Sequence, residues 1–243
     1  MENKWTLDTP DGAKIYGVKN STRDNAKSAI FMVHGLASHM HEYAFKQAAD
    51  FFAEEYDIYR FNLYDGDDGG RMLLKCTMQT HANDLNTVLA EFSDKYEKVF
   101  LIGHSYGGPT VMLANPKNIT AVSLWDPSFD LSHIQKEFSK DFVSSGGYYT
   151  VNWGTSYLIS KDMYDEAGNL DEIACADLAK NFSAPVQVIH AGDGFYVNFD
   201  KSYHSFGNSQ NIREVVAGTV HCFYEGNSCD DLLSKTKKWF SRF

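Results

Sequence analysis

Apolar residues along the chain form short continuous runs, and amphipathic stretches separate them. The candidate strands are residues 29–33, 56–61, 99–102 and 121–125, and residues 29–33 are a continuous apolar run. A strand without polar alternation is typical of a parallel sheet, where both faces are buried. Between these runs, residues 42–54 and 78–96 carry apolar side chains at helical spacing, and residues 110–114 can begin a helix. The resulting order of strand, helix and strand predicts an α/β fold with helices on both faces of the sheet.

The two ends of the chain extend this pattern. Residues 5–7 and 14–18 are short candidate strands around a Thr-Pro-Asp-Gly turn, which predicts an antiparallel hairpin. Near the other end, residues 185–190 and 212–216 are candidate strands, and residues 230–243 form an amphipathic helix.

The alternation of strands and helices stops between residues 128 and 182, which are rich in aromatic residues and show no clear strand followed by a helix. A segment of this length is too long for an ordinary loop. We therefore expect a core domain made of residues 1–127 and 183–243, and a cap made of residues 128–182. The cap would lie over the carboxyl ends of the strands, where ligands bind in open α/β sheets.

A Gly-x-Ser-x-Gly pattern follows the strand at 99–102, with Ser105 between Gly103 and Gly107. Between a strand and a helix, this spacing is typical of a sharp turn that exposes a nucleophilic serine above the sheet. The two glycines keep side chains out of the crowded space around it. The alternative is a glycine-rich turn with an incidental serine, so the choice depends on partner residues elsewhere.

A serine nucleophile needs a histidine base and an acid that orients the base. His221 follows the last strand and precedes the final helix, so it is the candidate base. Asp193, just after the strand at 185–190, is the first choice for the acid. Asp126 also ends a strand, directly after the nucleophile strand, and is the alternative; Asp200 ranks third.

The oxyanion of an acyl-transfer intermediate needs two backbone N–H donors near the serine. We expect them from Leu36, in the loop after the strand at 29–33, and from Tyr106, directly after Ser105. His34 is expected to hold that loop, His104 to pack beside the serine, and His190 to belong to the core.

Composition excludes several other classes of function. The 243 residues carry a formal net charge of −10 and no basic patch, which argues against nucleic acid as a partner. The acidic loop at 65–70 lacks the spacing of a calcium-binding loop, and the four cysteines lack metal-ligand spacing, so no metal is expected. The cysteines are expected to be free thiols, although a bridge between Cys222 and Cys229 remains open.

The chain begins with polar residues and contains no apolar run of membrane-spanning length. A cytoplasmic protein without a stable membrane anchor is therefore the expectation, and the oligomeric state stays open.

Taken together, the motifs resemble the capped α/β-hydrolases, a group of esterases, monoacylglycerol-lipase-like enzymes and serine-aminopeptidase-like hydrolases. The matching segments are residues 33–36, 100–108, 185–193 and 221–223. The resemblance implies a mostly parallel eight-stranded sheet and hydrolysis of carboxylic esters through an acyl-enzyme, without a cofactor.

The chain departs from the family pattern in three places. The family usually has two residues between a glycine and the acid, whereas Asp193 directly follows Gly192, which keeps Asp126 open. The family's Gly-His pair is interrupted between Gly218 and His221. The loop at 62–67 lacks the family's Asp-x-Arg-Gly-x-Gly pattern, so its local hydrogen bonding must differ.

The leading hypothesis is a serine esterase acting on a small-molecule acyl ester. The aromatic residues of the cap could line an acyl pocket; among them are Phe129, Phe138, Phe142, Tyr148, Tyr149, Trp153 and Tyr157. The same triad could instead cleave thioesters, amides or C–C bonds, or transfer acyl groups, because fold and triad are shared among these reactions. A third hypothesis is a non-catalytic protein of this fold that binds a small ligand.

Overall fold

The structure is a computed structural model, and it describes residues 1–243 except 24, 67–68, 139–141, 144–146, 153–155, 197–203 and 209. Its centre is an eight-stranded sheet in the order β1-β2-β4-β3-β5-β6-β10-β11. The strands are β1 (Glu2–Asp8), β2 (Lys14–Asn20), β3 (Ser28–Val33), β4 (Asp57–Phe61), β5 (Lys98–His104), β6 (Ala121–Trp125), β10 (Val186–Ala191) and β11 (Ile212–Val216). The last six strands of this order, from β4 to β11, pair in parallel with their neighbours. The hairpin of β1 and β2 adds two antiparallel strands at the β4 edge. The predicted mostly parallel sheet is confirmed.

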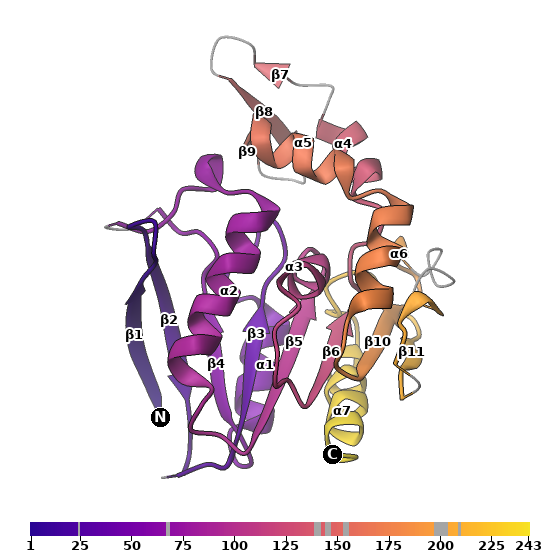
Figure 1. Ribbon diagram of the computed structural model, residues 1–243. Coiled ribbons are helices and arrows are strands. Elements are labelled where there is room, and N and C mark those ends of the chain that lie inside the picture. The colour runs from indigo at the N-terminus through magenta and orange to yellow at the C-terminus, as the bar shows by residue number, and fades with distance from the viewer. Residues whose placement is uncertain are drawn as a thin grey trace.

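Helices cover both faces of this sheet (Figure 1). α1 (Tyr43–Phe52) and α7 (Ser228–Phe240) pack on one face, and α2 (Met78–Phe92), α3 (Gly107–Ala114) and α6 (Glu172–Asn181) pack on the other. Each face has its own apolar core: Phe52, Trp125 and Trp239 belong to the first, and Phe31, Leu85 and Val111 to the second. Strand β3 is buried along nearly its whole length, which explains its continuous apolar sequence.

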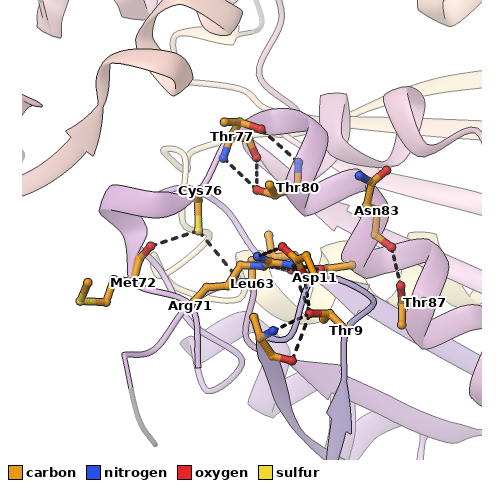
Figure 2. Close-up of polar contacts among 12 residues, drawn as sticks. Thr9, Asp11, Leu63, Arg71, Met72, Cys76, Thr77, Thr80, Asn83 and Thr87 are labelled. Atoms are coloured by element: carbon orange, nitrogen blue, oxygen red, sulfur yellow. Dashed lines mark hydrogen bonds and ion pairs between the residues drawn. The ribbon is translucent and has the colours of Figure 1, made fainter. Parts of the chain in front are cut away.

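Polar contacts fix the loop that joins β4 to α2, which includes the 3₁₀ helix η1 (Leu73–Lys75) (Figure 2). Arg71 Nη1 lies 2.7 Å from Asp11 in the N-terminal turn, and its Nε lies 2.7 Å from the buried Asp84 of α2. Thr77 caps α2 by accepting a hydrogen bond from the Thr80 N–H, while the Thr80 hydroxyl accepts one from the Thr77 N–H. Arg71 thus joins the edge hairpin to α2 in a loop that lacks the family's usual pattern.

A smaller unit lies at the end of the main sheet where the parallel strands finish (Figure 1). It contains α4 (Leu131–Phe138), α5 (Lys161–Asn169) and an antiparallel sheet of β7 (Phe142–Val143), β8 (Tyr148–Asn152) and β9 (Ser156–Ser160). The sequence predicted no strand followed by a helix in this segment, and this prediction is wrong, because β9 leads directly into α5. The helix α6, also within residues 128–182, contributes Cys175 and Ala179 to the core under the main sheet.

Among the described residues, no helix is both long and apolar enough to cross a bilayer.

Candidate active site

Ser105 occupies a sharp turn between the end of β5 and the start of α3. Its φ angle is +55°, in the left-handed region that L-residues avoid, and its N–H donates to the Trp125 carbonyl of the neighbouring strand at 3.0 Å. A Cβ on Gly107 would lie 2.1 Å from the Val33 carbonyl oxygen, so no side chain fits there. The motif therefore needs glycine at this position because the space around the serine is too crowded for a side chain, as the sequence suggested.

His221 links this serine to a buried carboxylate. Its Nε2 lies 2.8 Å from Ser105 Oγ, and its Nδ1 lies 2.6 Å from Asp126 Oδ2. In the neutral tautomer that carries the proton on Nδ1, the imidazole donates to Asp126 and accepts from the serine hydroxyl. The three side chains thus form one hydrogen-bonded chain from three loops at the carboxyl ends of the strands.

Asp126 is held as an anion although it is fully buried. Its Oδ1 accepts a hydrogen bond from the Ala191 N–H at 3.1 Å and lies 3.5 Å from His190 Nδ1. Burial alone would raise the pKa of Asp126, but the contacts with His190, His221 and Ala191 hold that pKa below its usual value. His190 is buried, as predicted, and it also contacts the carboxylate, which the sequence did not indicate.

The first-choice acid, Asp193, is not the carboxylate that lies beside His221 Nδ1. The Asp193 side chain is exposed, and its backbone N–H donates to the Thr219 carbonyl at 3.0 Å, so the residue shapes the loop before the base. The carboxylate beside His221 Nδ1 is that of Asp126, so the geometry favours the alternative acid over the first choice. The reason is the strand order: β6 lies between β5 and β10, next to the nucleophile strand. Asp200 lies outside the described residues.

His34 holds the loop that follows β3, as the sequence predicted. Its Nδ1 donates to the Gly35 carbonyl at 2.7 Å, and its Nε2 accepts from the Leu63 N–H at 3.0 Å. Complete burial lowers the pKa of His34 to about 4, so the ring is neutral, as these two bonds require. The loop carries Leu36, which lines one pocket together with Ser105 and Tyr106, the other residue expected to supply an oxyanion donor.

A cavity of about 630 Å³ opens over Ser105. Six aromatic residues share its wall: Tyr43, Tyr106, Tyr157, Phe195, Tyr196 and Tyr224. Of the aromatic residues expected to line an acyl pocket from the cap, only Tyr157 borders this cavity among the described side chains. Phe129 is buried in the core and Tyr149 stacks on Tyr164. Trp153 and the side chains of Phe138 and Phe142 lie outside the described residues.

His104 packs beside the nucleophile, as predicted, but it has a partner that the sequence did not reveal. Its Nδ1 lies 2.9 Å from Glu42 Oε1, and its Nε2 lies 3.0 Å from the backbone carbonyl oxygen of His221. Glu42 precedes α1, far from His104 in the sequence, and no motif marks it. Such a contact between distant segments becomes visible only in the folded chain.

The remaining expectations concern thiols and metals. All four cysteines are free, including Cys222 and Cys229. Within the described part of the chain, no group of three or more His, Cys, Asp or Glu side chains is arranged to hold a metal ion; Asp67 and Asp68 of the acidic loop lie outside it.

Several solved structures share this fold. The protein Est1E from Butyrivibrio proteoclasticus superposes with a TM-score of 0.76 at 17% identity, over 98% of this chain and 99% of that one. The esterase domain of a Rhodothermus marinus protein gives a TM-score of 0.77 at 16% identity, over 100% and 98% of the two chains. The mouse α/β hydrolase domain-containing protein 10 gives 0.77 at 15% identity, over 99% of each. At these identities the likeness establishes the fold.

No curated protein sequence matches the chain significantly. The family model described as serine aminopeptidase, S33, matches residues 24–157, which is more than half of the chain. This segment includes the loop after β3 and the serine elbow. The chain therefore belongs to the serine aminopeptidase S33 family of α/β hydrolases.

Proposed function

We propose that this hydrolase cleaves carboxylic esters through an acyl-enzyme on Ser105. The observation that supports this most is the unbroken hydrogen-bonded chain from Ser105 through His221 to Asp126, with distances of 2.8 and 2.6 Å. A nucleophile, a base within hydrogen-bond reach and an acid that orients the base are the three parts that nucleophilic acyl transfer requires.

In the proposed reaction, Ser105 Oγ attacks the ester carbonyl carbon while its proton moves to His221 Nε2. Asp126 stabilises the imidazolium that forms, without taking its proton. His221 then gives the proton to the departing alcohol oxygen, and the acyl group stays on Ser105. A water molecule, deprotonated by His221, attacks the acyl carbon, and the proton returns to Ser105 Oγ as the acid leaves.

The tetrahedral oxyanion needs donors that are already in place. We assign the backbone N–H groups of Leu36 and Tyr106 to this role. The hydrogen bonds of His34 and Tyr64 to the Gly35 carbonyl, at 2.7 and 3.4 Å, support a fixed loop. Preorganised donors of this kind act without reorganisation cost, and removal of one typically lowers kcat on the order of 10²- to 10³-fold.

The wall of the cavity favours an ester with a flat or apolar acyl group. Its six aromatic residues offer ring faces and edges, and Ser105 and His221 lie in the same wall. Est1E from Butyrivibrio proteoclasticus, similar in fold, has been solved with ferulic acid bound, which supports an aromatic acid as one acyl group to test.

The test is hydrolysis of p-nitrophenyl acetate, butyrate and an aryl-substituted acrylate ester by the wild type and by Ser105→Ala. We expect the substitution to abolish turnover of all three and to abolish labelling by a fluorophosphonate probe. Turnover that survives Ser105→Ala would remove this serine from the reaction. A folded wild type that the probe fails to label would favour a non-catalytic ligand-binding protein. Matched thioester and anilide substrates separate esterase from thioesterase and amidase activity.

A further inference from the structure

A second polar pair, outside the chain from Ser105 to Asp126, lies beside the backbone of His221. Glu42 Oε1 is 2.9 Å from His104 Nδ1, and His104 Nε2 is 3.0 Å from the His221 carbonyl oxygen. Only 7% of the His104 side chain and 10% of the Glu42 side chain are exposed. The rings of His104 and His221 lie with their centroids 4.9 Å apart.

The hydrogen bonds require a doubly protonated imidazole. A carboxylate and a peptide carbonyl are both acceptors, while a neutral imidazole carries a single N–H. Burial would lower the pKa of His104, but the Glu42 carboxylate and the His221 carbonyl raise it above its ordinary value. Burial would raise the pKa of Glu42, and His104 and Ser38 lower it. Both directions describe a buried ion pair of an imidazolium and a carboxylate.

This pair connects the three segments that build the site. His104 directly precedes Ser105 in the elbow and donates to the loop that carries His221. Glu42 stands at the N-terminal boundary of α1, and its second oxygen accepts a hydrogen bond from the hydroxyl of Ser38, in the loop that carries Leu36. The elbow, the base loop and the expected oxyanion loop are therefore tied by one continuous set of hydrogen bonds.

We propose that Glu42 and His104 are positioning residues, which hold the base loop and the oxyanion loop in register with Ser105 while His104 is charged; this rests on the proposed acyl-enzyme function. If His104 loses a proton, its tautomers can no longer satisfy both neighbours. The tautomer protonated at Nδ1 keeps the hydrogen bond to Glu42 and leaves the His221 carbonyl without its donor. The tautomer protonated at Nε2 sets a lone pair against the carboxylate.

The pair should therefore limit activity at high pH. The charged and titratable groups facing His104 are Glu42 before α1, His221 in the base loop, Asp126 after β6 and His34 after β3. The two carboxylates favour the imidazolium, and Glu42 is in direct contact with it. We expect kcat/KM to fall on the alkaline side as His104 loses its proton.

The experiment compares the pH profiles of kcat and KM for the wild type, Glu42→Gln and His104→Gln. Glutamine at position 42 can accept the same hydrogen bond but carries no charge, so the alkaline limb should move to lower pH by about 1 to 3 units. Glutamine at position 104 can donate to the His221 carbonyl but does not titrate in this range, so the alkaline limb should disappear. Both changes should act on kcat more than on KM.

Glu97→Gln is the matched control. It also removes a carboxylate from an ion pair, but this pair lies at the surface, where 65% of the Glu97 side chain and 76% of the Lys27 side chain are exposed. Its profile should superpose on that of the wild type. An observation that needs no variant is the ¹⁵N NMR spectrum of His104 in the wild type, in which both ring nitrogens should carry protons at pH 7.

A singly protonated His104 at pH 7 would overturn the proposal, as would profiles of Glu42→Gln and His104→Gln that superpose on the wild type. Failure of the proposed acyl-enzyme function would give different results. Ser105→Ala would then retain the wild-type turnover, or the fluorophosphonate would not label the wild type, whatever residue stands at position 42 or 104.

Discussion

The acid of the candidate triad illustrates what a single residue position depends on. Asp126 and Asp193 both follow strands of the parallel sheet, so both carboxylates lie at the same edge. What separates them is the backbone at Asp126, whose φ angle of +39° turns the chain directly after β6, and the Ala191 N–H that holds its Oδ1. Neither feature is visible in the sequence, which left both aspartates open.

Substitution of the two aspartates by asparagine should separate their roles. Asp126→Asn replaces the acceptor at His221 Nδ1 by a group that can favour the wrong tautomer, and kcat should fall on the order of 10³- to 10⁴-fold. Asp193→Asn changes an exposed side chain, so kcat should stay within about twofold, as is usual for surface changes. The measurement is steady-state turnover of p-nitrophenyl butyrate by both variants. An equal loss in both, or a larger loss in Asp193→Asn, would contradict the assignment of Asp126.

Whole elements were predictable where their sequence patterns are strong. The buried strands β3, β5, β6 and β10 read as apolar runs, and the edge hairpin was marked by its turn. The strands β7, β8 and β9 of the smaller unit were not predicted, because they are short, and polar residues are frequent in β8 and β9. Their antiparallel pairing joins neighbouring segments, which periodicity over a window of five residues cannot distinguish from a loop. The helix α6 was placed with the cap, but Cys175 and Ala179 pack under the sheet.

The N-terminal cap of α2 offers a prediction about one element. Thr77→Ala removes the side chain that accepts from the Thr80 N–H, and the free energy of unfolding should fall by about 0.5 to 2 kcal/mol. Thr87→Ala is the matched control in the same helix. Its hydroxyl donates to the backbone carbonyl of Asn83, and alanine favours helix, so stability should stay the same or rise slightly. Both residues are drawn in Figure 2.

Urea denaturation at pH 7 measures both changes. Equal effects of Thr77→Ala and Thr87→Ala would show that the loss comes from removal of a threonine in general rather than from removal of the cap. The value of kcat should be unchanged in both variants, since neither residue lines the cavity over Ser105.

At the scale of the whole molecule, half of the eight non-glycine residues with positive φ angles in the described part of the chain lie in the loops around the candidate site. Ala37, Ser105, Asp126 and Phe223 all have positive φ angles, and they lie in the oxyanion loop, the elbow, the acid turn and the base loop. Such conformations cost on the order of 1 to 3 kcal/mol each and persist only when the surrounding structure enforces them. Here the two apolar cores on opposite faces of the sheet supply the rigid support. Sequence patterns predicted that sheet and located the serine and histidine, but not the polar contacts that align them.

Buried histidines should make the stability of the whole molecule depend on pH in the mildly acidic range. His81 is fully buried against Tyr64 and Tyr106, and neither of its ring nitrogens has a hydrogen-bond partner in the described part of the chain. Burial lowers its pKa to about 3, from an ordinary value of 6.5. Between these values the unfolded chain binds a proton that the native state does not, so stability decreases as the pH falls.

His81→Phe tests this directly. In the wild type this one histidine should lower the free energy of unfolding by about 1.4 kcal/mol for each pH unit from 6.5 down toward 3. Phenylalanine keeps an aromatic ring against Tyr64 and removes both buried nitrogens, so that contribution to the slope should vanish. His34, whose pKa is about 4, remains and keeps part of the dependence. Urea midpoints at pH 7, 6, 5 and 4 measure the slopes. Parallel curves for the wild type and His81→Phe would mean that His81 is protonated, or paired with a buried water, in the native state.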